Sequence, residues 1–343
     1  MSGSRAAAAA ITRRVRRWRP RGGILMYHCI CAEACDPWAI CIAPEHFDDQ
    51  MAVLAEARAA VPLADFADED GYTWDGSRVA VTFDDGYVDN LLVALPILEK
   101  YDIPATIFVV GNAVDRGREF WWDALQRAIL GPTTLPEVLD VPFGTGPRTF
   151  TSTDGWGAVA ENAGWRADAE DPRNRRQQLF RTLWDAIVVL GPDEQDGAVD
   201  HLLEWAGEPE IGVGSRLPVT GEQFAELARH PLITLGGHTR DHVSLTDMTL
   251  PDRHAQIDAG NRSVSELADA PVTQFAFPFG RFDVPTRNLL RDSDVTVGCT
   301  SVSTPAISSD DRHALPRLHA TDMDGDAFGR WLRRDHGLLG SRA

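Results

Sequence analysis

Apolar runs typical of β-strands alternate with helix-like segments along most of this 343-residue chain, and no other feature restricts the fold as strongly. Val79–Phe83 and Pro104–Gly111 are two such runs, and Asp89–Tyr101 between them has helical spacing, with a bend expected at Pro96. Strands that alternate with helices form a parallel sheet or barrel, so we expect an α/β protein. Further strands are expected at Gly23–His28, Leu232–Leu235, Phe275–Phe277 and Val295–Ser301, and further helices at Pro44–Ala57, Glu222–Arg229, Asp252–Leu267 and Pro285–Asp292.

The alternation is interrupted between about Asn112 and Thr220. This region contains amphipathic segments such as Arg175–Leu190 and a piece rich in glycine, proline and threonine, Gly131–Trp156. We expect a mostly helical insertion at about 112–220 within a single barrel domain that comprises residues 23–343.

Charge separates the first 22 residues from the rest of the chain. The whole chain carries a net charge of −18, which excludes the nucleic-acid backbone as its main partner. Residues 1–22 are instead rich in arginine and predict a basic, disordered tail, with peripheral contact to an anionic membrane as the alternative. Ala6–Ile11 is too short for the apolar core of a signal peptide, and no run of about eighteen apolar residues follows. The expected location is therefore the cytoplasm.

Four of the five cysteines lie close together in the sequence, at Cys29, Cys31, Cys35 and Cys41. Their spacing lacks the paired C-x₂-C pattern of structural zinc sites, and a cytoplasmic location disfavours disulfides. Reduced thiols that fill a strand and loop are the favoured interpretation, and a local metal or disulfide cluster is the alternative.

Three expected strands end in residues that carry chemistry. Asp84 and Asp85 follow the first of these strands, His238 and His242 follow the second, and Pro278–Gly280 follows the third. In α/β barrels, functional side chains lie where strands end and the following loops begin. Two histidines four residues apart can bind one metal ion if the loop turns through one helical turn, and a carboxylate would complete the ligand set.

These motifs resemble those of a known family. TFDDG, HTRDH and FAFPFG, in this order on alternating strands and helices, are similar to the motifs of the NodB-like polysaccharide deacetylases, carbohydrate esterase family four. The resemblance spans about Ile24 to His319 with the insertion set aside. It implies a distorted (β/α) barrel and a metal-dependent N- or O-deacetylase.

The resemblance also implies roles for the residues of the first two motifs. Asp85, His238 and His242 would bind one divalent metal ion, with zinc expected, and Asp84 would be the catalytic base. Such an ion lowers the pKa of a bound water toward roughly 7 and polarises the acyl carbonyl. Asp84 would take the proton from that water.

Two histidines are candidates for the general acid that protonates the leaving amine. His28 lies in MYH and matches the N-terminal Tyr-His motif of family members whose motif order is permuted. His319, in LPRLH, lies where unpermuted members carry a C-terminal histidine. We favour His28, and His319 remains the alternative.

The third motif departs from the common family pattern. Ala276 stands where many members carry an arginine that orients the base, and Arg317 or Arg281 could replace that arginine in space. The resemblance implies that the oxyanion is held by the metal and by a backbone N–H, for which Phe279 after Pro278 is the candidate. Arg317 and Pro278 are therefore further candidates for substrate contact.

The resemblance implies hydrolysis of an acetyl group, with an N-acetylated amino sugar favoured as substrate. Trp121 and Trp122 in the insertion are candidates to line the pocket, because aromatic faces suit sugar rings; packing within the insertion is the alternative. A cytoplasmic location would favour a nucleotide-linked, lipid-linked or natural-product saccharide. Two other functions remain open: a hydrolase of a non-sugar amide, and a non-catalytic carbohydrate-binding relative.

Overall fold

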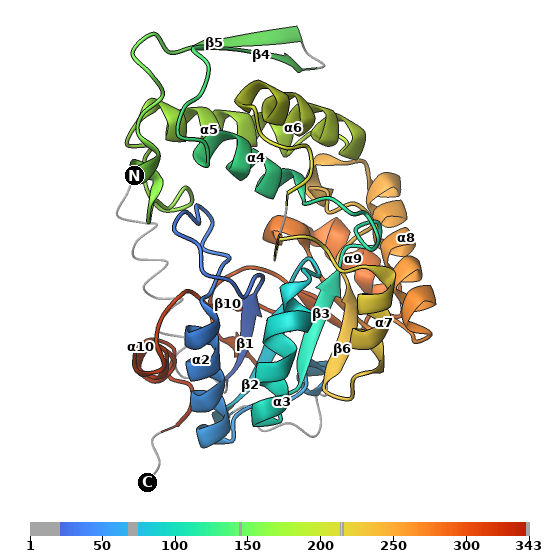
Figure 1. The fold of residues 1–343 in the computed structure, drawn as a ribbon. Helices are drawn as coiled ribbons and strands as arrows, with labels where there is room; N and C mark the ends of the chain where they lie inside the picture. Colours follow the sequence, from blue (N-terminus) through green and yellow to red (C-terminus); the bar gives the residue numbers. More distant parts are fainter. Residues whose placement is uncertain (1–20, 68–74, 144–145, 213, 215, 341–343) are drawn as a thin grey trace, which may run out of the picture.

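An eight-stranded sheet forms the frame of the molecule (Figure 1). The computed structural model describes residues 21–67, 75–143, 146–212, 214 and 216–340. Seven strands follow the order β10-β1-β2-β3-β6-β7-β8 with parallel neighbours, and β9 pairs antiparallel with β1. The strands are β1 (Arg21–Tyr27), β2 (Asp75–Phe83), β3 (Ala105–Val109), β6 (Ile233–Gly237), β7 (Gln274–Ala276), β8 (Val297–Cys299), β9 (Ala306–Ile307) and β10 (Leu318–His319).

The two ends of the sheet approach each other. An isolated bridge joins Cys299 at the end of β8 to Leu315, in the segment that leads into β10. Here the Thr300 N–H donates to the Leu315 carbonyl at 2.8 Å, and the Leu315 N–H donates to the Gly298 carbonyl at 2.7 Å. The sheet is therefore curled into a half-barrel, and the expected distorted (β/α) barrel is confirmed.

The register of the strands brings their carboxyl ends to one level. Tyr27 pairs with Phe83 at the ends of β1 and β2, and Val109 pairs with Gly237 at the ends of β3 and β6. The loops after these strands therefore open at the same edge of the sheet. The residues that directly follow β1, β2 and β6 are His28, Asp84 and His238.

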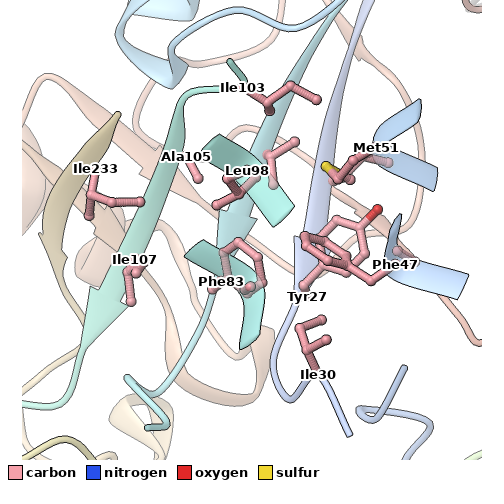
Figure 2. Close-up of a cluster of buried hydrophobic side chains, with 14 of the residues drawn as sticks. Tyr27, Ile30, Phe47, Met51, Phe83, Leu98, Ile103, Ala105, Ile107 and Ile233 are labelled. Atoms are coloured by element: carbon pink, nitrogen blue, oxygen red, sulfur yellow. The ribbon is translucent and has the colours of Figure 1, made fainter. Parts of the chain in front are cut away.

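Helices pack against the sheet, and the core lies between them (Figure 2). The Tyr27 ring centroid lies 5.2 Å from that of Phe47, and the Phe47 centroid lies 5.7 Å from that of Phe83. These rings are at most 1% exposed, and burying each apolar side chain contributes about 2 kcal/mol. The helices are α2 (Pro44–Ala57), α3 (Leu95–Tyr101), α7 (Gly221–Arg229), α8 (Leu250–Ala268), α9 (Val284–Arg291) and α10 (Gly325–Arg330).

Pro96 changes the helix type at the position where a bend is expected. Asn90–Ala94 forms a π-helical turn, closed by the Leu95 N–H, which donates to the Asn90 carbonyl. The α-helix α3 begins at Leu95, so Pro96 stands in its first turn, where the missing N–H of proline costs no hydrogen bond.

Residues 112–220 form a layer over the carboxyl ends of the strands (green in Figure 1). Its described residues form three α-helices, a short 3₁₀ helix (Val159–Asn162) and also a β-hairpin that was not predicted from the sequence. Leu139 and Val141 are buried while Asp140 between them is exposed, so the period-two pattern is present but very short. The elements are α4 (Trp121–Leu130), β4 (Val138–Phe143), β5 (Gly146–Thr151), α5 (Arg175–Ile187) and α6 (Pro192–Ala206).

The bounds of several elements differ from expectation. β1 begins at Arg21, so the expected tail is shorter than 22 residues; residues 1–20 lie outside the described part, and their disorder and membrane contact stay predictions. β6 continues through Gly236 and Gly237, beyond the expected end at Leu235. Glycine is needed at position 236, because a Cβ there would lie 2.5 Å from Phe108. β10 and α10 were not predicted. Within the described residues, no helix is long and apolar enough to cross a membrane.

Candidate metal and catalytic site

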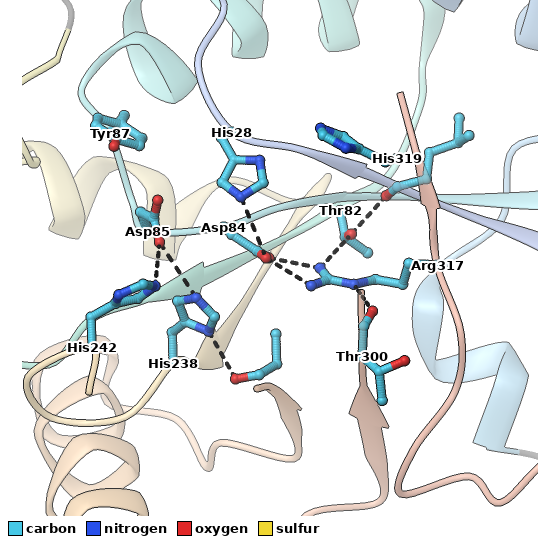
Figure 3. Close-up of polar contacts among 12 residues, drawn as sticks. His28, Thr82, Asp84, Asp85, Tyr87, His238, His242, Thr300, Arg317 and His319 are labelled. Carbon is cyan, nitrogen blue, oxygen red and sulfur yellow. Dashed lines mark hydrogen bonds and ion pairs between the residues drawn. The ribbon is translucent and has the colours of Figure 1, made fainter. Parts of the chain in front are cut away.

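Three side chains converge at the carboxyl edge of the sheet (Figure 3). Asp85 follows β2, and His238 and His242 follow β6. Asp85 Oδ1 lies 3.4 Å from His238 Nε2 and 3.2 Å from His242 Nε2, and all three side chains are buried. One carboxylate and two imidazoles form the facial donor set that suits zinc and other divalent first-row ions.

Left-handed backbone conformations direct these side chains. The φ angles are 76° at Asp85, 82° at Gly86, 64° at Thr239 and 53° at His242. Such angles are uncommon for residues other than glycine, and backbone strain of this kind clusters at functional sites. In a strand that continued regularly, Asp84 and Asp85 would point to opposite faces. The turn at Asp85 instead keeps both carboxylates beside the histidines (Figure 3).

The three residues fit a divalent cation. Asp85 Oδ1 and His242 Nδ1 are buried and make no hydrogen bond. His238 Nδ1 lies 2.8 Å from the Ala276 carbonyl, so it carries the proton and leaves Nε2 available as a ligand. Burial opposes ionisation of Asp85, but the two histidines hold its pKa well below the usual range. A buried, ionised carboxylate oxygen that accepts no hydrogen bond is stabilised once a positive charge binds beside it.

Asp84, the neighbour of Asp85, has a cation of its own. Arg317 donates through Nη1 to Asp84 Oδ1 and through Nη2 to Asp84 Oδ2, each at 2.7 Å. Burial alone would raise the pKa of Asp84, but the charge of Arg317, followed by that of His238, outweighs burial and lowers it. Asp84 is therefore an ionised carboxylate in a fixed orientation, as a general base must be.

Arg317 is itself held in place by three groups. Its Nε donates to the Thr300 carbonyl at 2.9 Å, and its Nη1 donates to Thr82 Oγ1 at 3.2 Å. The guanidinium carbon lies 5.5 Å from the centre of the Phe108 ring. The side chain is 1% exposed, so it positions Asp84 and has little surface for a substrate.

Arg281, the other candidate to replace the motif arginine, lies elsewhere. Its Nη1 donates to Ser244 Oγ and to Asp247 Oδ2, each at 3.3 Å. Of the two arginines, Arg317 is therefore the one that contacts the base, and Ala276 contributes its carbonyl to His238 instead of a guanidinium.

His28 lies near Asp84, and His319 lies beside His28. His28 Nε2 is 3.9 Å from Asp84 Oδ2, and the two histidine rings are 6.2 Å apart. His319 Nε2 lies 2.9 Å from the Ala39 carbonyl, and burial, with a contribution from His28, lowers the pKa of His319 to about 4. A histidine that is neutral near pH 7 and bound to a carbonyl is poorly suited to donate a proton, so the geometry favours His28.

Aromatic side chains of the insertion form a wall beside the histidines. The Trp122 ring lies 4.4 Å from the His242 ring, and the Trp121 ring lies 4.6 Å from that of Trp184. Trp121 and Trp122 are 3% and 5% exposed, so most of each ring packs against protein. Phe279 also packs on His242, at 4.6 Å between ring centres.

The segment Pro278–Gly280 forms a tight 3₁₀ turn at the end of β7. Pro278 is buried, whereas Phe279 is half-buried and has a φ of 55°. This left-handed conformation brings the Phe279 ring to His242. The expected roles of the Phe279 N–H at the oxyanion and of Pro278 in substrate contact stay predictions.

A polar network behind the wall was missed from the sequence. Tyr87 Oη donates to Asp123 Oδ2 at 2.8 Å and accepts the Trp122 Nε1–H at 2.8 Å. Arg216 Nη1 donates to Asp123 Oδ1 at 2.6 Å, while burial raises the pKa of Asp123 to about 7. The only local signal was the position of Tyr87 directly after TFDDG.

Comparisons with known proteins agree with this fold. The family model described as polysaccharide deacetylase matches residues 72–138 and 205–298, and the unmatched stretch between them lies within the insertion. The Bacillus subtilis protein YxkH, which is classed by name with the polysaccharide deacetylases, is 25% identical over 121 residues, 35% of this chain. The matched segment spans 43% of that relative's length.

Solved structures share the fold over most of their length. The Streptococcus pyogenes deacetylase PplD in complex with acetate has a TM-score of 0.56 and 16% identity, covering 90% of this chain and 96% of its own. A de-N-acetylase from Aggregatibacter actinomycetemcomitans has a TM-score of 0.54 and 14% identity, covering 91% of this chain and 99% of its own.

The curled α/β half-barrel with its three strand-end motifs thus defines the class of protein. The chain contains a polysaccharide deacetylase domain, which the family model matches over residues 72–138 and 205–298.

Proposed function

We propose that this chain is a metal-dependent deacetylase that releases acetate from an N-acetylated amino sugar. The observation that carries the proposal is the contrast between two adjacent carboxylates: Asp84 is bound by Arg317, and Asp85 faces His238 and His242. A hydrolase of this type needs one carboxylate as base and another as ligand. The family assignment, and the names deacetylase and de-N-acetylase of structurally similar proteins, support acetyl as the group removed.

Asp85, His238 and His242 would hold one divalent ion, and zinc suits this donor set. When bound, the ion supplies Lewis acidity, which makes a nearby water easier to deprotonate and the acyl carbonyl more electrophilic.

Asp84 accepts the proton of the attacking water. Its lowered pKa keeps the carboxylate ionised at neutral pH, and the two donors of Arg317 fix its plane. A carboxylate has about four lone-pair positions, so two bonds to Arg317 leave it able to accept a further proton. Arg317 is a positioning residue in this scheme.

His28 donates a proton to the leaving amine. It lies on the Asp84 side of the site, and its side chain is 16% exposed, so a substrate can reach it. The Phe279 backbone N–H is the proposed donor to the oxyanion. His319, half-buried and bound to the Ala39 carbonyl, would instead support the His28 side of the site.

The proposed substrate is an N-acetylated amino sugar in a saccharide intermediate, with an O-acetyl ester as the less favoured alternative. The proposed location is the cytoplasm, where nucleotide-linked, lipid-linked or natural-product saccharides would be substrates. Trp121 and Trp122 would act mainly by excluding water around His242, since little of their rings is exposed.

Metal analysis of wild type beside Asp85→Ala and His238→Ala, with acetate release measured on a panel of N-acetylated sugars, tests the proposal. We expect zinc at this site and acetate release in wild type, and we expect each of the two variants to lose one equivalent of zinc and the release of acetate. His230→Ala, which removes a histidine bound to Glu99, is the matched control and should retain both. Full metal occupancy in Asp85→Ala and His238→Ala would contradict the assignment of these residues as metal ligands.

The same panel separates the other two functions. Acetate release from N-acetylated amides that are not sugars, with none from sugars, would favour the non-sugar hydrolase. Metal and saccharide binding without release from any compound would favour the non-catalytic relative.

A further inference from the structure

Three cysteines gather at a second point, on the loop between β1 and α2. The Sγ atoms of Cys29, Cys31 and Cys41 all lie within 4.8 Å of one another. Cys35, in the same loop, lies outside this group, and the described residues contain no disulfide. The sequence spacing did not predict the cluster, because the chain folds back between Cys31 and Cys41.

Backbone hydrogen bonds fix the two parts of the loop that carry the thiols. The Cys29 N–H donates to the Ile40 carbonyl, and the Ile42 N–H donates to the Cys29 carbonyl, each at 3.0 Å. Asp36 accepts the Ile40 N–H at 3.1 Å and the Cys41 N–H at 2.8 Å. The thiols are therefore held together before any ligand binds, which lowers the entropy lost on binding.

A half-buried cation, Arg216, faces the cluster. Arg216 Nη2 donates to Cys41 Sγ at 3.0 Å, while Nη1 of the same guanidinium donates to Asp123. Three thiolates around a divalent ion leave one negative charge in excess, and Arg216 can offset that charge. A cluster that served only to fill space would need no cation at its sulfur, because an apolar side chain would pack equally well.

The exposure of the three residues differs in a way that suits metal entry. Cys29 and Cys41 are buried, whereas Cys31 is half-buried and gives access from solvent. A fourth ligand could come from water on that side, which would complete a tetrahedron around zinc or cadmium.

We propose that Cys29, Cys31 and Cys41 form a second metal site, which binds a thiophilic divalent d¹⁰ ion such as Zn²⁺. Thiolate donors distinguish it from the site of Asp85, His238 and His242. The ion replaces the thiol protons, because cysteine binds such an ion as its thiolate. Binding therefore releases protons and strengthens as pH rises.

Titration of the metal-free, fully reduced full-length protein with Cd²⁺ tests this proposal, because cadmium bound to thiolates gives a charge-transfer absorption in the ultraviolet. Wild type should bind about two equivalents and develop this absorption. His238→Ala should lose one equivalent and keep the absorption. Cys31→Ser should weaken the absorption, because one of three thiolates is removed, and should bind the second equivalent roughly 10- to 100-fold more weakly.

Cys35→Ser is the matched control, since it removes a cysteine of the same loop that lies outside the cluster; it should leave the absorption unchanged. Cys31 is the least buried of the three ligands, so its replacement by serine should leave the melting temperature of the metal-free protein unchanged. No absorption in reduced wild type, or an equal loss in Cys35→Ser and Cys31→Ser, overturns the site. Titration with Zn²⁺ should protect Cys31 from alkylation, and unprotected Cys31 at two equivalents would also overturn it.

Discussion

Asp84 and Asp85, the two residues that follow β2, have the same side chain but different surroundings. Asp84 and Asp85 are each 3% exposed. Asp84 meets a guanidinium that the chain itself provides, whereas Asp85 meets two histidines and has an oxygen without a hydrogen bond. Burying a carboxylate is unfavourable unless a positive charge accompanies it. In the proposed mechanism the protein therefore supplies one counter-charge internally and takes the other from solution as a metal ion.

This difference teaches how two adjacent acids can take different roles. The Arg317 fork leaves Asp84 ionised but not coordinated, which suits a proton acceptor. The open oxygen of Asp85 suits a ligand. If the comparison is correct, changes on the Asp84 side should lower kcat and leave the metal content unchanged. Changes on the Asp85 side should lower the metal content first.

The largest expected effect is that of Asp84→Asn compared with Asp85→Asn. Both substitutions keep the shape and remove the charge. Asp84→Asn should lower kcat by roughly 10²- to 10⁴-fold and retain the metal, because it removes the base alone. Asp85→Asn should lose the metal. Metal analysis and acetate release on the same samples measure both, and equal metal loss in the two variants would erase the distinction between the carboxylates.

Arg317→Ala should give the next largest effect, on stability. It leaves Asp84 buried without its cation, and removing one partner of a buried ion pair costs about 3–5 kcal/mol. Urea unfolding measures this loss. Arg317→Lys keeps the charge and loses the fork, so it should fold and bind metal while its kcat falls. Arg281→Ala is the control and should change neither quantity; a normal kcat in Arg317→Lys would show that orientation of Asp84 is unimportant.

Sequence and structure agree where the signal is local. The adjacent acids at the end of a buried strand and the two histidines four residues apart form their cluster through short loops, so the motifs predict it. Arg317 is 233 positions from Asp84 and reaches it only because β10 pairs with β1. The sequence could name Arg317 as a candidate, but only the closing of the sheet separates it from Arg281.

The same argument explains the elements that were missed. Strands buried on both faces, such as β2 and β3, have long apolar runs and were predicted. β10 has only two residues, and its pairing with β1 comes from the curl of the sheet, not from local propensity. The three-cysteine cluster likewise depends on a fold-back of the chain that residue spacing does not encode.

A smaller expected effect concerns His319, on the Asp84 side. Its pKa falls from 6.5 to about 4 on folding, so the unfolded chain binds the proton more tightly. Stability should therefore be complete above about pH 6.5 and should fall by about 3 kcal/mol as the pH drops to about 4. Urea unfolding across this range should show a weaker pH dependence in His319→Asn.

His254→Asn, which replaces an exposed histidine on α8, is the control for that experiment and should keep the wild-type pH dependence. A slope unaffected by His319→Asn would mean that His319 is charged in the folded protein. Arg317 would then share the Asp84 side with a second cation, and the comparison between the two carboxylates would need revision.

The smallest expected effect comes from Thr82→Val, which changes one contact of Arg317 on the Asp84 side of the comparison. Thr82 Oγ1 donates to the Leu25 carbonyl at 2.7 Å and accepts from Arg317 at 3.2 Å. Thr106 occupies the paired position on β3, and its hydroxyl donates to Gln274 at 2.8 Å, away from Arg317. Each change to valine keeps the volume and removes hydrogen bonds, so each should lower the free energy of unfolding by about 1 kcal/mol.

The two threonine variants should differ in catalysis. Thr82→Val releases one of the groups that hold Arg317, so kcat should fall severalfold while KM and metal content stay unchanged. Thr106→Val should keep the wild-type kcat at the same loss of stability. Equal rates in the two variants would mean that Thr300 and Phe108 alone hold the guanidinium. The position of the charge beside Asp84 would then not depend on Thr82.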